Sequence, residues 1–222
     1  MSDHKSRLSS RSQVHMTTSI ISNNMELADL WRDSIYRVNL IIMILSWSAS
    51  SFCFYIIGFY IKYIPGDIFV NMITTCIADV ISSIVAGVIA QYIGTQRTLF
   101  GSFAISALGG VCLNLVQKQN KILIMIIIMT TKFGINIAFT LCYIINAEYF
   151  PSIICSRVFG ICNIFSRIST ILSPLIAEVT PPMPMVIYVF VCFISMIASL
   201  FLTKTGSDDI DLALQDLDDS IS

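Results

Sequence analysis

The chain has 222 residues, of which 55% are hydrophobic and only 12% are charged, and its mean hydropathy is +0.80. Soluble domains carry about 25% charged residues, so this composition excludes an ordinary soluble fold and indicates a protein whose solvent is lipid. The formal net charge is −1 and no basic stripe lies outside the N-terminal segment, so a nucleic-acid partner is excluded as well.

Residues 1–36 form a polar N-terminal segment that is rich in Ser and Thr and carries scattered Lys and Arg. The segment lacks the apolar core of a signal peptide. We expect it to be solvated and cytoplasmic.

Six apolar segments follow, and each can cross a hydrocarbon layer of about 30 Å, for which about 20 residues suffice. Their connections are short and contain turn or polar residues. The expected spans are residues 38–61, 68–93, 98–116, 122–147, 153–179 and 185–203. This pattern predicts that residues 37–204 form an all-α, integral membrane bundle of six transmembrane helices, in which neighbouring helices are antiparallel.

Residues 205–222 form an acidic tail with six Asp residues. We expect it to be a solvated acidic tail, although apolar residues recur in it at a spacing that would allow a short amphipathic helix to dock on a partner. The docked helix is the alternative. In either case we expect a cytoplasmic segment.

The distribution of Lys and Arg sets the expected orientation, because cytoplasmic loops carry an excess of both. Cytoplasmic termini place eight basic residues inside and only three outside. The inside group is Lys5, Arg7, Arg11, Arg32, Arg37, Arg97, Arg157 and Lys204. We expect both termini in the cytoplasm, and the plasma membrane rather than an organelle as the location.

Three ionisable residues, Asp79, Lys132 and Arg167, fall near the middle of their spans. A charge at that depth costs at least about 2.5–3.5 kcal/mol, so it faces a cavity or a partner. Asn136 and Tyr143 share the helix face of Lys132. Asp79 can pair with either cation simply to neutralise buried charge, but two cations against one carboxylate leave one positive charge over. We therefore expect a substrate-binding role at mid-depth.

Enzyme chemistry is not indicated. The two histidines lie in the N-terminal segment, and no Gly-x-Ser-x-Gly or His-x-x-x-His pattern occurs. The seven cysteines lie in apolar segments without a Cys-x-x-Cys pair, which predicts packing rather than a metal site or disulfides. We expect no catalysis, no metal and no cofactor.

An ordered series of short motifs resembles the C-terminal half of the organic anion and organic cation transporter family of the major facilitator superfamily. The central motif is Asn146-Ala147-Glu148-Tyr149-Phe150-Pro151, where the family has Glu-Leu-Tyr-Pro. The others, at the family's spacing, are Trp47, Ser51-Phe52, Phe54-Tyr55, Gly160-Ile161-Cys162, Phe165-Ser166-Arg167, Leu172-Ser173-Pro174-Leu175 and Pro182-Met183-Pro184-Met185-Val186-Ile187-Tyr188. The resemblance covers about residues 30 to 205.

The resemblance implies transport of small organic ions by alternating access, in which two six-helix bundles rock around a central site. The position of Arg167 is Arg in the family's anion branch and Asp in its cation branch, which favours anions. Lys132 matches a basic position in both branches, and Tyr55 matches an aromatic residue of the cavity. Ser83 stands where the anion branch has a lysine.

Gating residues are expected at the cytoplasmic ends of the helices. Glu148 and Arg157 flank the junction of the fourth and fifth spans, and Arg97 ends a loop that reads Gly-Thr-Gln-Arg rather than the family's Gly-Arg-Arg. Cys155 replaces an arginine of the family motif. Both departures affect the expected cytoplasmic gate.

One half of such a transporter needs a second bundle. The expected partners are the lipid bilayer, a small organic ion, and either an N-terminal six-helix half or a second copy of the chain. The sequence is then a piece of a longer gene product. The alternative is a half-size membrane protein that dimerises, or that regulates a full transporter without transporting.

Overall fold

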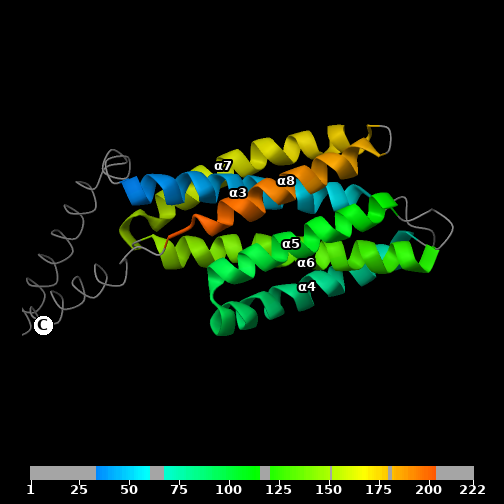
Figure 1. Cartoon of the computed structure of the whole chain (residues 1–222), viewed down its shortest axis with the longest axis horizontal. Coiled ribbons are helices and arrows are strands. Elements are labelled where there is room, and N and C mark those ends of the chain that lie inside the picture. Colours follow the sequence, from blue (N-terminus) through cyan, green and yellow to red (C-terminus); the bar gives the residue numbers. More distant parts are fainter. Residues whose placement is uncertain (1–33, 61–67, 116–120, 151, 180–181, 204–222) are drawn as a thin grey trace, which may run out of the picture.

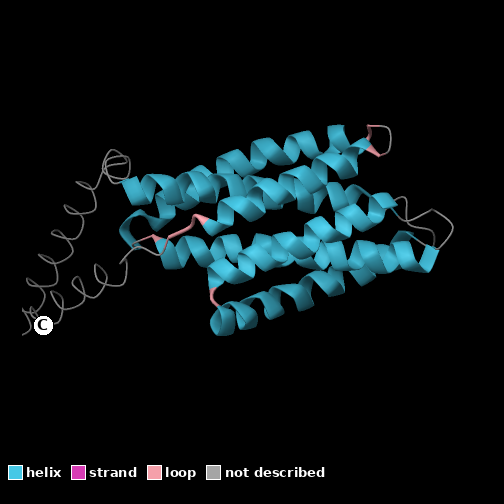
Figure 2. Cartoon of the chain, viewed as in Figure 1, coloured by secondary structure: helices cyan, strands magenta, loops and turns pink. Residues whose placement is uncertain are grey.

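The structure is a computed structural model that describes residues 34–60, 68–115, 121–150, 152–179 and 182–203. Within these residues the chain is helical and contains no strand (Figure 2). The helices are α3 (Ser34–Tyr60), α4 (Ile68–Ile93), α5 (Thr95–Leu115), α6 (Lys121–Tyr149), α7 (Ser152–Ala177) and α8 (Met183–Leu200). All six are long and apolar enough to cross a membrane. The expected all-α, six-span membrane bundle is confirmed, and the protein is an integral, multi-pass membrane protein.

The helix bounds follow the expected spans closely. The bounds of α4 agree with the expected 68–93, whereas α3 begins earlier, at Ser34, and α6 continues to Tyr149, so that both include polar residues beyond the expected spans. A helix does not stop where the hydrocarbon stops, because residues in the headgroup region continue its hydrogen bonding. The expected segments 1–36 and 205–222 lie almost entirely outside the described residues and stay predictions.

The helices form two layers. In the first layer α4 packs against α6, α6 against α3, and α3 against α7, so that α4 and α7 lie at the two edges (Figure 1). In the second layer α5 packs against α6 and α8, and α8 also packs against α3. One face of the α4–α6–α3–α7 layer is therefore covered by α5 and α8, while no described helix packs on the opposite face. We call the opposite side the open face.

Small residues allow the second layer to approach closely. A Cβ added at Gly134 of α6 would lie 3.1 Å from backbone atoms of α5, and one added at Gly109 of α5 would meet the Thr131 side chain. Within the second layer, Ser106 of α5 and Tyr188 of α8 share a hydrogen bond between their hydroxyl groups, and both are buried. Close backbone approach and interhelical hydrogen bonds are the interactions that hold membrane helices together.

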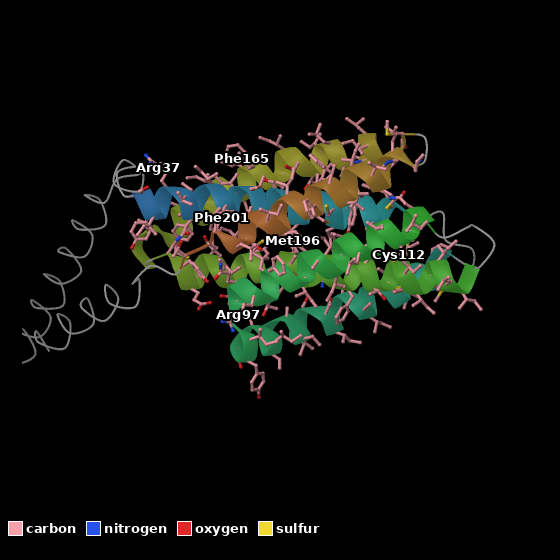
Figure 3. The ribbon with its side chains drawn as sticks, in the orientation of Figure 1. Arg37, Arg97, Cys112, Phe165, Met196 and Phe201 are labelled. Carbon is pink, nitrogen blue, oxygen red and sulfur yellow. The ribbon has the colours of Figure 1, made fainter. Side chains whose placement is uncertain are left out.

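Polar side chains join three helix termini at one end of the bundle. Asn39 of α3 donates from Nδ2 to the backbone oxygen of Thr203 (2.7 Å) and accepts from its backbone N–H (3.1 Å). Gln96 donates from Nε2 to the oxygen of Leu200 (3.0 Å), near the end of α8. Arg37 and Arg97 lie toward this same end, and Cys112 lies toward the other (Figure 3). The first described residues and the last ones are thus on one side of the bundle.

Candidate functional site on the open face

A buried ion pair joins α4 to α6 midway along both helices. Lys132 Nζ lies 3.0 Å from Asp79 Oδ2, and the side chains are 8% and 23% exposed. Lys132 Nζ also lies 5.1 Å from the centre of the Phe54 ring of α3, in a cation–π contact. The structure thus gives Lys132 both a counter-ion and an aromatic face, and it assigns Asp79 to Lys132 rather than to Arg167.

Hydrogen bonds from α6 fix the backbone of α4 around Asp79. The amide nitrogen of Asn136 donates to the backbone oxygen of Asp79 (2.8 Å) and to Ser82 Oγ (2.5 Å). The hydroxyl groups of Ser82 and Ser83 donate to the same backbone oxygen, each at 2.9 Å. Asn136 is buried, and its position one helical turn after Lys132 lets α6 hold both the carboxylate and the carbonyl group of Asp79.

Aromatic side chains of α3, α6 and α7 form a connected cluster, which we call the aromatic cluster. The Trp47 and Tyr143 rings are 4.7 Å apart between centroids, the Tyr143 and Phe139 rings 5.4 Å, and the Phe139 and Phe54 rings 5.8 Å. Its members are Trp47, Phe54, Tyr55, Phe139, Tyr143 and Phe159. Tyr55, Tyr143 and Phe159 are partly open to solvent, with 37%, 42% and 39% of their surfaces exposed. The cluster is large and apolar, and it carries hydroxyl groups at its exposed rim.

Arg167 lies beside this cluster on α7. Its neighbour Ser166 is buried against α3, where its hydroxyl group hydrogen-bonds that of Ser51 (2.5 Å). Arg167 itself is exposed, and its charge interacts electrostatically with the hydroxyl group of Tyr143 on α6. Within the described residues it has no ion pair. The guanidinium cannot lose its proton in a protein, so among the described residues it remains a positive charge without a carboxylate partner.

Five of the six expected substrate-binding residues are linked by contacts, and Arg167 is linked to them by an electrostatic interaction. Asp79, Lys132 and Asn136 meet directly, and Tyr55 and Tyr143 reach Lys132 through the Phe54 and Phe139 rings. Arg167 joins at the other end, through Tyr143. The structure therefore separates the three mid-depth charges into an ion pair and a single cation, with the aromatic cluster between them.

The expected gating residues lie at the junctions of helices. Glu148 and Arg157 are partly buried on either side of the α6–α7 junction, and Arg97 is exposed in the first turn of α5. Across the same junction the side-chain amide of Asn146 donates to the backbone oxygen of Cys155 (3.3 Å), and the Cys155 thiol donates back to the backbone oxygen of Asn146 (3.4 Å). The cysteine that replaces the family's arginine thus connects the end of α6 to the start of α7.

Four residues of this site were not singled out for it from the sequence: Phe54, Trp47 and Phe159 of the aromatic cluster, and Ser82, which binds Asn136. Phe54 and Trp47 are seven residues apart, which places them on one helix face. That spacing was the available signal. Ordinary core residues have the same spacing, so only the positions of α6 and α7 show that these rings belong to the site and not simply to the core.

No protein-family model matches the chain. Organic anion transporter 3 of Oryctolagus cuniculus is 24% identical over 194 residues, which cover 86% of this chain and 36% of that protein. Organic cation/carnitine transporter 2 of Homo sapiens is 26% identical over 148 residues, or 67% of this chain and 27% of that protein. The chain is similar to organic anion and organic cation transporters.

A further relative, solute carrier family 22 member 16 of Xenopus laevis, is 25% identical over 203 residues and is matched over 90% of this chain and 36% of its own length. The predicted resemblance to this family is confirmed. The chain spans about a third of the length of these relatives. The similarity extends along nearly all of the six-helix bundle, so the open face described above belongs to the region shared with these transporters.

Proposed function

We propose that this chain supplies six membrane helices of a transporter for small organic ions, with anions preferred over cations, that works by alternating access. One observation carries the proposal. The open face presents an aromatic cluster beside Arg167, whose charge has no ion pair within the described residues. An amphipathic anion matches both features, because its apolar part can pack on the rings while its charge meets the guanidinium.

The charge balance of the face favours an anion. Asp79 neutralises Lys132 at 3.0 Å, so the charges of the ion pair cancel and Arg167 leaves a net charge of one positive unit. A guanidinium binds a carboxylate or a similar oxyanion through two parallel hydrogen bonds, which a lysine cannot reproduce. Binding in a site of low polarity strengthens this interaction relative to water.

A second bundle is required to close the open face. We propose that an N-terminal six-helix half or a second copy of the chain covers it. The exposure of Tyr55, Tyr143 and Arg167, which no described helix covers, supports this assignment. Rocking of two such bundles would expose the site alternately to the two sides of the membrane.

We further propose that both termini are cytoplasmic, in the plasma membrane, and that the cytoplasmic gate involves Glu148, Arg157 and Arg97. The position of Arg37 and Arg97 toward the end that holds the first and last described residues supports this orientation (Figure 3). Glu148 and Arg157 flank the α6–α7 junction at the same level of the fold as the Asn146–Cys155 connection.

An uptake comparison tests the proposed function. Cells that express the complete protein are supplied with radiolabelled benzenesulfonate, an aromatic anion, or with tetraethylammonium, an organic cation. We expect saturable uptake of benzenesulfonate above that of cells without the protein, and less uptake of tetraethylammonium. Uptake of the cation alone would overturn the anion preference, and uptake of neither ion would contradict transport of small organic ions.

A further inference from the structure

The carboxylate of Asp79 is only half satisfied. Oδ2 pairs with Lys132, whereas Oδ1 is buried and has no hydrogen-bond partner. The nearby donors, Asn136, Ser82 and Ser83, all point to the backbone oxygen of Asp79 instead of its side chain. Buried polar atoms are nearly always hydrogen-bonded, so a bare carboxylate oxygen in this place calls for an explanation. Because Lys132 holds Oδ2, Oδ1 is the carboxylate oxygen that is left to accept a proton.

The groups around Asp79 determine how a bound proton would change the charge of the site. Lys132 faces it from α6, and the uncharged Phe54 ring lies beside Lys132 on α3. Cys76 precedes Asp79 by about one turn on α4 itself. Helix α5 contributes Arg97, in its first turn, and the free thiol of Cys112, and α8 carries no charged residue. Arg167 of α7 interacts electrostatically with Tyr143 and forms no ion pair with Asp79. Within the described residues Asp79 is therefore the single acidic group at mid-depth of the bundle.

We propose that Asp79 binds a coupling proton that enters together with the organic anion. This inference rests on the proposed function and assigns its driving ion. A proton from water binds to Oδ1 and forms a neutral carboxylic acid, which ends the neutralisation of Lys132. The ammonium group then adds its charge to that of Arg167 at the two ends of the aromatic cluster. Without the proton the carboxylate keeps Lys132 neutralised, and the face attracts an anion less strongly.

The same scheme explains the return step. When the anion and the proton leave on the other side, Asp79 is ionised again and re-forms its ion pair with Lys132. The empty site then contains no unpaired charge at the Asp79 end, so it can change orientation at lower cost than a site with a free ammonium group. The anion and the proton thus move in the same direction, one proton for each anion.

Proteoliposomes that contain the complete protein and a trapped pH-sensitive dye test the proposal. Benzenesulfonate is the probe, because a sulfonate stays ionised at every pH used and cannot carry a proton across the lipid by itself. We expect its entry to acidify the lumen. We also expect its apparent affinity to rise as the external pH falls, by up to about tenfold per pH unit, which is the limit for linkage to one proton.

Asp79→Asn mimics the protonated carboxyl group. We expect this variant to bind benzenesulfonate with an affinity that does not change with pH, and to move it without acidifying the lumen. Glu178→Gln is the matched control, since Glu178 is exposed beyond the end of α7 and should leave both responses unchanged. The two measurements on the unmodified protein remain decisive if Asp79→Asn does not fold.

The failure of this inference is distinguishable from that of the proposed function. Benzenesulfonate uptake without lumen acidification and without pH dependence would overturn the proton site and leave anion transport intact. If no benzenesulfonate enters, the infrared carbonyl band of protonated carboxyl groups decides. A band that appears on acidification, persists in Glu178→Gln and is lost in Asp79→Asn supports a proton on Asp79, and a spectrum that Asp79→Asn does not change overturns it.

Discussion

Removal of Asp79 should destabilise the protein because it leaves the buried Lys132 ammonium without a counter-ion. The Lys132 side chain is 8% exposed, and its other charge-stabilising contact among the described residues is the Phe54 ring at 5.1 Å. Removing one partner of a buried ion pair costs about 3–5 kcal/mol. Partial exposure of Asp79 places the expected loss near the lower limit, about 3 kcal/mol, or roughly 150-fold in the ratio of folded to unfolded protein.

Thermal unfolding of the complete protein in detergent measures this loss. Several cysteine thiols are buried and react with a fluorescent maleimide only when the helices separate; they are Cys53, Cys142, Cys162 and Cys192. We expect Asp79→Ala to lower the unfolding midpoint clearly, and Asp79→Ala/Lys132→Met to recover most of it, since the double variant buries no charge. Arg167→Met should change it little, because an exposed side chain without an ion pair contributes within about 0.5 kcal/mol. An unchanged midpoint in Asp79→Ala, or no recovery in the double variant, would refute the reasoning.

Three further predictions follow from the packing and the aromatic cluster. Gly109→Ala should cost about 1–3 kcal/mol by the same unfolding assay, since its Cβ would lie 2.9 Å from the Cβ of a threonine of α6, whereas Gly101→Ala has open space and should cost nothing. Asn39→Ala should expose the end of α8 to faster amide hydrogen exchange, because two hydrogen bonds to that end are lost, each worth about 1 kcal/mol. Tyr143→Ala should weaken benzenesulfonate uptake, while Phe190→Ala, which removes an exposed ring from α8, should not.

The positions of the helices could be predicted from the sequence because lipid imposes a single requirement on every span. Backbone groups must be satisfied within the segment, so hydropathy and length together indicate a helix. The expected 68–93 matches α4, even though Asp79 interrupts it. The extra residues of α3 and α6 could not be predicted this way, because residues near Tyr36 and Glu148 are polar enough to end a hydrophobic window while remaining helical.

The partners of the mid-depth charges could be predicted only in part. Depth along each helix placed Asp79, Lys132 and Arg167 at a similar level, but the order of helices around a bundle is not encoded in hydropathy. Helix α4 packs on α6, while α3 lies between α6 and α7, and this order decides that Asp79 pairs with Lys132. The same order brings Phe54 under Lys132, a contact between residues 78 positions apart that no periodicity within one helix could indicate.

The central claim, that Arg167 selects an organic anion on the open face, is tested most directly by reversing its charge. Arg167→Asp and Arg167→Lys are made in the complete protein, and benzenesulfonate uptake is compared at matched surface expression. We predict that Arg167→Asp abolishes uptake and that Arg167→Lys reduces it, because a lysine lacks the two-pronged hydrogen bonding of the guanidinium. Unchanged benzenesulfonate uptake by Arg167→Asp at normal surface expression would contradict the claim.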